Sequence, residues 1–320
     1  MFDFVGVGVL VLLLVLFGWL TTRAWRIKSG ALRWLATIPA GLLTLVTLFL
    51  TGAALNGFYK LNRTYDNPVR EFSVAGTPEQ LAQGQKIARA CAGCHSPNGD
   101  LPLLGQNFFE GGGPPVGTLW APALTAAHFQ DWSDGEIIRA LREGVHKSGR
   151  SLIIMPANAF HTMSDEDAQA VVAFIRQHEP NAPDTPPTNI NVIGALLINI
   201  APLQTRQEPV AGPVAAPPAG PTAEYGEYLL GVSGCRDCHS ANLAGVVPEP
   251  NGPPPGPNIT GVDERLTLEQ FIALFRTGTY PDGSQLSEEM PWQDFEFYTD
   301  DDLTAIYRQL EQLETLPDNQ

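Results

Sequence analysis

The stretch Cys91-Ala-Gly-Cys94-His95 is matched in pattern by Cys235-Arg-Asp-Cys238-His239. Cys-x-x-Cys-His is the attachment signature of c-type haem. Two thioether bonds tie one haem edge to such a turn, and the histidine is then held beneath the iron as the proximal ligand. All four cysteines of the chain belong to these two motifs, which predicts two covalently bound haem c groups with iron ligated by His95 and His239.

Two other kinds of Cys-x-x-Cys site fit the sequence less well. A zinc ribbon separates its two cysteine pairs by about 15 to 20 residues, whereas 140 residues lie between Cys94 and Cys235. A thioredoxin-like site needs a strand before its motif, but the stretch before Cys91 has the pattern of a helix. Haem attachment also accounts for the histidine that ends both motifs.

The sequences that surround the two motifs are weak copies of each other. Each copy has a helical stretch before the motif, a Gly/Pro-rich loop after it, and then an amphipathic helix that ends at a glycine. A Met-Pro pair follows, and a helix with an acidic first turn closes the copy. No strand alternation is apparent, so we expect a mainly α fold. The matching landmarks are Pro122 and Pro257, Ser133 and Thr267, Gly144 and Gly278, Met155 and Met290, and Ser164 and Thr299.

Few methionines and histidines are available as the sixth ligand of each haem iron. Met290 and His239 are the only methionine and histidine of the second copy, so elimination predicts Met290 as the ligand there. In the first copy Met155 matches Met290, because each precedes a proline. Met163 is expected to pack in a helix core instead, and the histidines are most simply surface residues. The alternative ligands in this copy are His128, His146, His161 and His178.

Pro122 and Pro257 are candidates for a supporting role. The second ring nitrogen of a ligating histidine usually donates to a backbone carbonyl, which fixes the ring. We therefore expect these two carbonyls to accept from His95 and His239. The alternative is that each proline only shapes its loop.

The amino-terminal region has the pattern of a membrane hairpin. Apolar runs cover residues 4–20 and 35–55, close to the ~20 residues that cross a bilayer. The loop between them carries Arg23, Arg26, Lys28 and Arg33 without an acidic residue, which places it in the cytoplasm by the positive-inside rule. We expect a transmembrane hairpin in residues 1–60, with helices at about 4–22 and 35–56. A cleaved signal peptide is the alternative, but its charges would precede the apolar run.

Everything after about residue 60 is then expected outside the cytoplasm, where covalent haem attachment occurs. We predict two domains, residues 68–180 and 222–320, joined by a Pro-rich linker at 181–221. An apolar island in the linker, residues 190–200, is too short to span a bilayer and should pack onto a neighbouring domain.

The charge of the chain is unevenly distributed. The total is −15, from 19 basic and 34 acidic residues. Residues 1–66 hold six basic and two acidic residues, a net charge of +4, so residues 67–320 carry −19. This argues against a nucleic-acid binder. An acidic exported surface favours docking onto a basic patch of a redox partner.

The two motifs with Met155-Pro156 and Met290-Pro291 resemble two class I cytochrome c domains in tandem. The Pro-x-x-Thr loops and acidic-capped closing helices also resemble those of membrane-bound bacterial dihaem cytochromes. The resemblance implies covalent haem c, His/Met ligation and one-electron transfer. Such ligation leaves no open position on the iron, which disfavours enzymatic chemistry there.

We therefore expect an electron carrier of the inner membrane with its haem domains in the periplasm, and not an enzyme. The hairpin favours a subunit of a respiratory or photosynthetic complex. Candidate partners are a quinol-oxidising complex of the alternative complex III type, an oxidase or a reaction centre. A tethered shuttle between complexes is the first alternative, and a dihaem peroxidase is a weaker one because no haem lacks a candidate methionine.

Overall fold

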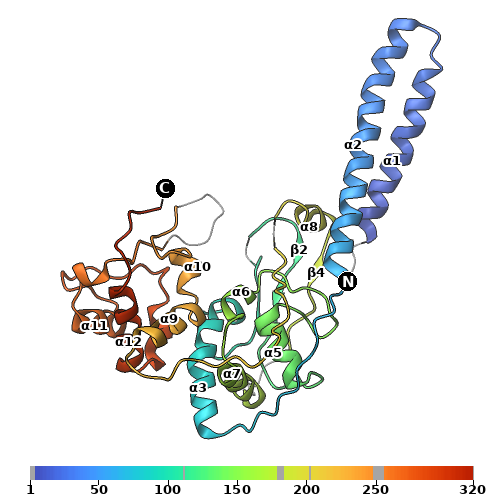
Figure 1. Ribbon diagram of the computed structural model, residues 1–320. Coiled ribbons are helices and arrows are strands. Elements are labelled where there is room, and N and C mark those ends of the chain that lie inside the picture. Colours follow the sequence, from blue (N-terminus) through green and yellow to red (C-terminus); the bar gives the residue numbers. More distant parts are fainter. Residues whose placement is uncertain (1–3, 111, 179–183, 202, 248–255, 320) are drawn as a thin grey trace.

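The computed structural model describes residues 4–110, 112–178, 184–201, 203–247 and 256–319. A hairpin of two long helices projects from a globular body that has two halves (Figure 1). The first half lies at the foot of the hairpin and contains helices α3 to α8, and the second half, with α9 to α12, lies on its far side. The described part of the chain is mainly helical, as expected, and its four strands have two residues each.

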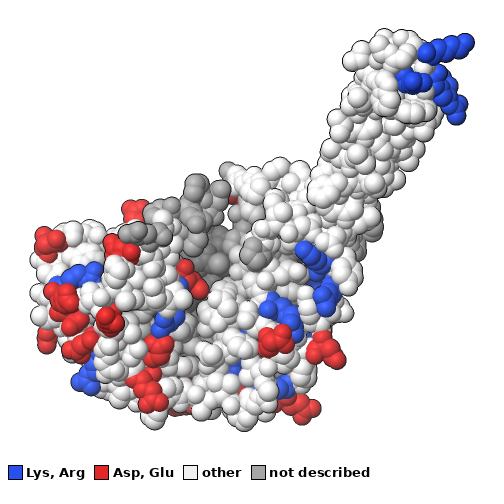
Figure 2. Space-filling model, turned by 45° about the horizontal axis from the view of Figure 1, so that its top comes forward, with Lys and Arg blue, Asp and Glu red and all other residues white. Residues whose placement is uncertain are grey.

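The hairpin consists of α1 (Phe4–Trp25) and α2 (Gly30–Asn62), which pack along each other. Both are long and apolar enough to cross a membrane. The two predicted apolar segments are helices, but α2 begins five residues before and ends six residues after the expected range of 35–56. Their side chains are mostly exposed apolar groups, and Figure 2 shows basic side chains gathered at the tip. The hydroxyls of Thr21 and Thr44 lie 3.0 Å apart and join the two helices. The place of the hairpin in a membrane stays a prediction.

The first half follows the expected order of elements. Its elements are α3 (Pro78–Ala88), the 3-10 turn η1 (Arg89–Cys91), α4 (Ala92–His95), β1 (Gln106–Asn107), β2 (Gly117–Thr118), β3 (Trp120–Ala121), α5 (Asp134–Glu143), α6 (Ala157–Phe160) and α7 (Asp165–Gln177). The Ser133 hydroxyl accepts from the Glu136 amide in a capping box at α5, and Ser164 caps α7. Gly144 ends α5 with φ 61°, a conformation that favours glycine.

The second half repeats this order of helices, with a shorter stretch between its cysteine turn and the amphipathic helix. Its elements are α9 (Ala223–Val232), α10 (Cys235–His239), η2 (Val262–Glu264), α11 (Leu268–Thr277), η3 (Trp292–Phe297) and α12 (Asp300–Glu311). Thr267 and Thr299 form capping boxes at α11 and α12. Gly278 ends α11 with φ 67°. The caps and stops predicted from the sequence are therefore where the helices begin and end.

The first and last helices of each half cross at a glycine. A Cβ atom on Gly84 would lie 1.9 Å from the Ala170 carbonyl oxygen, and one on Gly226 would lie 1.9 Å from that of Ala305. Only glycine permits this approach, because any side chain would collide with the partner backbone. The same contact thus sets the helix crossing of α3 with α7 and of α9 with α12.

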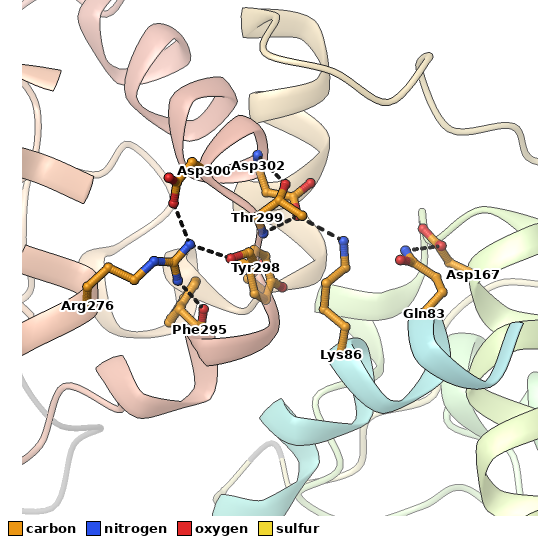
Figure 3. A network of polar contacts seen from close by, with 10 residues as sticks. Gln83, Lys86, Asp167, Arg276, Phe295, Tyr298, Thr299, Asp300 and Asp302 are labelled. Atoms are coloured by element: carbon orange, nitrogen blue, oxygen red, sulfur yellow. Dashed lines mark hydrogen bonds and ion pairs between the residues drawn. The ribbon is translucent and has the colours of Figure 1, made fainter. Parts of the chain in front are cut away.

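The two halves contact each other through a reciprocal pair of bonds at their closing helices. Lys86 of α3 donates to Asp302 of α12 at 3.1 Å, and both side chains are buried (Figure 3). In the opposite direction, the Tyr228 hydroxyl of α9 donates to Asp167 of α7. Counted from Gly84 and Gly226, Lys86 and Tyr228 hold equivalent positions. The contact between the halves therefore has approximate two-fold symmetry.

The Pro-rich segment lies against the first half. Strand β4 (Asn189–Ile190) pairs with β2, and α8 (Val192–Leu197) packs on the outer end of α2. Further along, the Thr205 amide donates to the Leu152 carbonyl at 3.2 Å. The apolar island thus packs on a neighbour as expected, and that neighbour is the foot of the hairpin. The domain boundaries remain a prediction.

Candidate haem sites

Each Cys-x-x-Cys-His motif forms a short helical turn with its histidine buried beneath the loop that follows. In the first half, His95 is 7% exposed and its Nδ1 lies 2.7 Å from the Pro122 carbonyl oxygen. In the second half, His239 is also 7% exposed, and its Nδ1 lies 2.7 Å from the Pro257 carbonyl oxygen. A proton on Nδ1 makes each bond and leaves Nε2 as the nitrogen that can bind a metal.

The loops that bring the two prolines to the histidines are built alike. The Gly105 amide donates to the His95 carbonyl at 2.6 Å, and the Gly245 amide donates to the His239 carbonyl at 3.1 Å. Further on, Leu124 N donates to the Leu103 carbonyl at 3.0 Å. The matching bond in the second half joins Ile259 N to the Leu243 carbonyl at 2.9 Å. Both loops therefore fold back over the histidine in the same way.

The first motif opens into a large cavity. Its volume is about 620 Å³, and Cys91, Cys94, His95 and Met155 all lie on its wall. Ligand pockets commonly measure about 300–1,000 Å³ and are mostly apolar. Aromatic and aliphatic side chains line most of the remaining surface, including Leu119, Phe129, Trp132, Leu141, Phe160 and Val171. An apolar macrocycle bound between a histidine and a methionine fits this donor set and this lining.

The two Met-Pro pairs adopt the same local conformation. Pro156 has φ −78° and ψ 59°, and Pro291 has φ −78° and ψ 56°. The residue after each proline donates its amide to the methionine carbonyl, at 2.7 Å from Ala157 and 2.8 Å from Trp292. Met155 and Met290 both pack, partly buried, against the apolar core. These matching turns are compatible with the predicted sixth-ligand roles, which stay predictions.

Strain accompanies the methionine turn of the first half. Ile154 has φ 66°, a left-handed conformation that is an outlier for a β-branched residue. Its amide donates to the Leu203 carbonyl at 2.8 Å, so the segment that follows α8 holds it in place. Strained residues of this kind tend to lie at functional sites. Ile154 directly precedes Met155.

Burial sets the protonation states of the motif residues. Burial raises the pKa of the thiols of Cys91 and Cys235 to about 12, so both are neutral thiols at pH 7. Burial also lowers the pKa of His95 and His239, which keeps both rings neutral, as a metal ligand must be. Across the described ranges, no group of three or more His, Cys, Asp or Glu side chains could hold a metal ion.

The other candidate ligands of the first half have different environments. Met163 is 1% exposed in the apolar core, as the sequence suggested. The four remaining histidines are half-buried rather than on the surface, and each has a hydrogen-bond partner: Asp184 for His128, Ser148 for His146, the Arg142 carbonyl for His161 and the Leu103 amide for His178. His128 and His146 also line the cavity, which sequence reasoning missed.

Part of the Pro-rich segment closes the cavity of the first half. Thr185 and Thr188, with Asp184, Pro186 and Pro187, lie on its wall. The Trp120 amide donates to the Thr188 hydroxyl at 2.9 Å, and the Ala123 amide donates to the Thr185 hydroxyl at 3.3 Å. Composition predicted an extended segment here but could not tell where it would lie.

Both cysteine turns face the contact between the halves. The charge of Asp294, in η3 of the second half, contributes to the raised pKa of the Cys91 thiol in the first half. Across the same contact, Lys86 of the first half lies 5.3 Å from the ring of Tyr298, whose hydroxyl is 2.8 Å from Ser233 near the second motif. Buried apolar residues of both halves form one continuous cluster.

The sequence profile of the family named Cytochrome c matches residues 81–179. The first half of the body is a cytochrome c family domain. This domain contains the first cysteine motif, Pro122 and Met155, and the second motif at 235–239 is consistent with a second haem site.

The curated relatives include cytochrome subunits of several dehydrogenases. Over 293 residues the chain is 25% identical to the alcohol dehydrogenase (quinone) cytochrome c subunit of Gluconacetobacter polyoxogenes, covering 78% of this chain and 60% of that protein. It is 34% identical over 103 residues to the gluconate 2-dehydrogenase cytochrome c subunit of Pantoea cypripedii, covering 29% of this chain and 22% of that one. The fructose dehydrogenase cytochrome subunit of Gluconobacter japonicus is 33% identical over 99 residues, covering 27% of this chain and 20% of that protein. The chain thus spans less than two thirds of the length of each.

Proposed function

We propose that the chain is a dihaem cytochrome c that transfers single electrons as a membrane-anchored subunit of a dehydrogenase complex. The observation that carries the proposal is the duplicated site, in which a Cys-x-x-Cys-His turn has its histidine Nδ1 2.7 Å from a proline carbonyl in both halves. Homology to cytochrome c subunits of dehydrogenases supports the electron-transfer role.

The residues of each site have separate tasks in this proposal. Haem iron held by His and Met exchanges single electrons at a potential that the thioether ligand raises. Cys91 and Cys94 hold one group in the first half, and Cys235 and Cys238 hold the other. His95 and His239 are oriented by their carbonyl partners, and the apolar cavity around the first site excludes water. Met155 and Met290 complete the two ligand sets.

The arrangement of the halves supports relay between the two sites. Both cysteine turns face the contact, and the bonds between Lys86 and Asp302 and between Tyr228 and Asp167 fix one half against the other. Fixed donors and acceptors need little reorganisation when an electron moves. We infer that electrons pass between the halves without a change in their relative position.

The connection to the hairpin favours a subunit over a mobile shuttle. A shuttle needs a loose segment after the membrane helices, but the described segment at 63–77 is bonded to the first half. Asn67 is 3% exposed and donates to Glu143 at 2.6 Å. Arg70 forms an ion pair with Asp165 at 2.7 Å. The first half is therefore held at the foot of the hairpin.

The relatives suggest a class of partner that the sequence alone did not favour. Sequence reasoning named a quinol-oxidising complex, an oxidase or a reaction centre, whereas the relatives are dehydrogenase subunits. We propose that a dehydrogenase subunit on the periplasmic side delivers electrons to this chain. The orientation follows from the basic tip of the hairpin, which the positive-inside rule assigns to the cytoplasm.

The haem assignment is tested on the purified full-length chain. Haem staining after denaturing electrophoresis should show covalent haem, and the pyridine haemochrome spectrum should give two haems per chain. A value of one or none contradicts the dihaem proposal.

The subunit assignment needs a separate test in the native host. Membranes are solubilised gently, the chain is captured through a carboxyl-terminal tag, and co-purifying proteins are identified. A dehydrogenase subunit that reduces the haems on addition of its substrate supports the proposal. Recovery of the chain alone, or with an oxidase or a reaction centre, overturns the dehydrogenase assignment while leaving the haem result intact.

A further inference from the structure

A second cavity lies where the hairpin joins the first half. Its volume is about 590 Å³, and its wall combines the end of α2 with the segment that follows α8. Helix α2 contributes the polar and basic residues Asn56 and Lys60, and Arg63 follows it. The segment after α8 contributes Ile198 and Ile200 together with Asn199 and Gln204. The proposed electron transfer makes no use of this cavity.

The cavity lies at the depth of lipid headgroups if the hairpin spans the membrane. The basic loop with Trp25 and Trp34 marks the inner surface. From Trp34 to Lys60 the helix rises about 39 Å at 1.5 Å per residue. A bilayer measures about 40–45 Å across with its headgroups, and its hydrocarbon core about 30 Å. Lys60 therefore lies beyond the hydrocarbon, in the outer headgroup layer.

Helix α8 and the residues that follow it are bonded to the end of α2 beside this cavity. The Asn199 side chain donates to the Ala53 carbonyl at 2.9 Å and accepts from Asn56 at 2.6 Å. A Cβ on Gly57 would lie 1.7 Å from the Ala195 carbonyl oxygen, so the two segments touch backbone to backbone. The segment is thus fixed beside the membrane surface and does not hang from it.

Exposed apolar side chains on this fixed segment continue the surface of the hairpin. Ile200 is 80% exposed and Ile193 is 41% exposed, although both belong to a segment held against α2. On α2 itself Leu55 is 53% exposed at the same level. An apolar surface continuous with a membrane helix has acyl chains as its natural cover.

The charge of the cavity is opposite to that of the exported chain. Residues 67–320 carry a net charge of −19, yet the described residues that line this cavity include Lys60 and Arg63 and none that is acidic. Figure 2 shows basic side chains on the body close to the foot of the hairpin. Arg63 also lies 5.0 Å from the ring of Tyr65, which holds the guanidinium at the rim.

We propose that this cavity binds an anionic phospholipid of the outer leaflet. Lys60 and Arg63 bind its phosphate, and Ile200 and Ile193 contact its acyl chains. The site therefore fixes the height of the first haem domain above the membrane. This inference rests on the anchoring part of the proposed function and is independent of the haem assignment.

Lipid retention by the full-length protein tests the headgroup contact. Delipidated protein in detergent receives phosphatidylglycerol, and native mass spectrometry counts the lipids that stay bound. Loss of both cations in K60Q/R63Q should lower retention by roughly tenfold or more, since each basic residue near a membrane surface contributes to binding. Arg308→Gln removes an exposed cation of the second half and should change nothing. Equal retention by K60Q/R63Q overturns the proposal, as does displacement of the lipid by inorganic phosphate.

Spin labels in lipid nanodiscs test the apolar contact. Nitroxides are attached at Ile200→Cys, at Glu208→Cys as a control in water, and at Leu45→Cys as a reference within α2. Power saturation with oxygen and a nickel chelate then reports depth. We expect the label at residue 200 near the acyl boundary and the label at 208 in water. If the label at residue 45 is in lipid but the label at residue 200 is in water, the lipid-site proposal is wrong while the membrane anchor is supported. If the label at residue 45 is also in water, the proposal that the hairpin anchors the chain in the membrane is wrong as well.

Discussion

The two halves of the body share the elements that we propose to hold a haem and differ in most of what surrounds them. The cysteine turn, the proline carbonyl, the Met-Pro turn and the capped closing helix correspond between the halves, down to proline dihedrals that agree within 3° in ψ. The first half adds four short strands, a covering Pro-rich segment and four more histidines. The matched cytochrome c profile covers residues 81–179, which lie in this half.

The additional strands and Pro-rich segment of the first half show which parts of its structure are not shared by the two proposed haem sites. The described residues of the second half form the Cys-x-x-Cys-His and Met-Pro turns without a matching additional layer. In the first half the layer lies between the cavity and the hairpin, through α8 and the segment before it. We infer that the additional structure serves attachment to the helical hairpin. Matched substitutions in the two halves show whether they are equivalent where they look alike.

Removing the cysteines of one motif should have the largest effect. C91S/C94S and C235S/C238S should each lower the haem content from two groups per chain to one, because thioether bonds need both thiols. Pyridine haemochrome analysis of the purified proteins gives the ratio. A variant that keeps two haems, or that loses both, would contradict two independent sites.

Replacing the methionines tests whether the two ligand sets are the same. Met155→Ala and Met290→Ala should each abolish the near-infrared Met–iron band of one haem. Each should also lower one midpoint potential by roughly 0.2 V, within the ~0.8 V range that axial ligands span. Spectroelectrochemical titration measures both.

The matched control for the methionine test is Met163→Leu, in the apolar core of the first half. It should leave both potentials unchanged and cost less than about 1.5 kcal/mol of stability. An unchanged near-infrared band in Met155→Ala would instead make His128 and His146, which also line the cavity, the candidates for the sixth ligand.

Substitutions at Gly84 and Gly226 test whether the helix contacts α3–α7 and α9–α12 are packed equally tightly. Gly84→Ala and Gly226→Ala place a methyl group 1.9 Å from a backbone oxygen, so each should lower the free energy of unfolding by about 3 kcal/mol. Gly231→Ala, in the same helix as Gly226, meets nothing within 4 Å and should be neutral or stabilising by up to about 1 kcal/mol. Urea unfolding of the three variants decides. A tolerated alanine at 84 but not at 226 would show that the first half can adjust where the second cannot.

The contact between the halves is expected to give a smaller effect. Lys86→Met leaves Asp302 buried, but Asp302 keeps hydrogen bonds from Tyr225 and the Thr299 amide. We therefore expect a loss of about 1–2 kcal/mol, below the ~3–5 kcal/mol of a fully broken buried pair. Tyr228→Phe, at the equivalent position, should cost about 1 kcal/mol. Thermal unfolding measures both, and flash photolysis tests the expected slower electron transfer between the haems. An unchanged rate of electron transfer in the double variant K86M/Y228F would show that this contact does not position the two haem sites.

Sequence reasoning succeeded where structure is encoded locally. Ser133 and Thr267 begin helices because their hydroxyls cap the next turn, and Gly144 ends one because it accepts a positive φ. The cysteine motifs are equally local. It failed where distant segments meet. Lys86 and Asp302 lie 216 residues apart, and nothing in the composition of residues 184–188 shows that they close a cavity. The two apolar runs were found, yet α2 extends to Asn62 because its end packs on α8.

The halves also differ in the side chain that each presents to the cysteine turn of the other half. Counted from Met155 and Met290, Asp294 of the second half corresponds to Ala159 of the first. Burial raises the pKa of Asp294 to about 6, partly opposed by Arg89 and increased by the charges of Asp100 and Glu296. Between its ordinary pKa near 4 and this value, the folded state binds more protons than the unfolded state, so stability should fall as pH rises through this window.

Urea unfolding of the full-length protein between pH 4 and 7 tests this difference. Asp294→Asn cannot titrate and should remove this part of the pH dependence, with the largest gain over the native protein above pH 6. Ala159→Asn is the matched control at the equivalent position and should leave the slope unchanged. If Asp294→Asn keeps the native slope, the titrating group lies elsewhere.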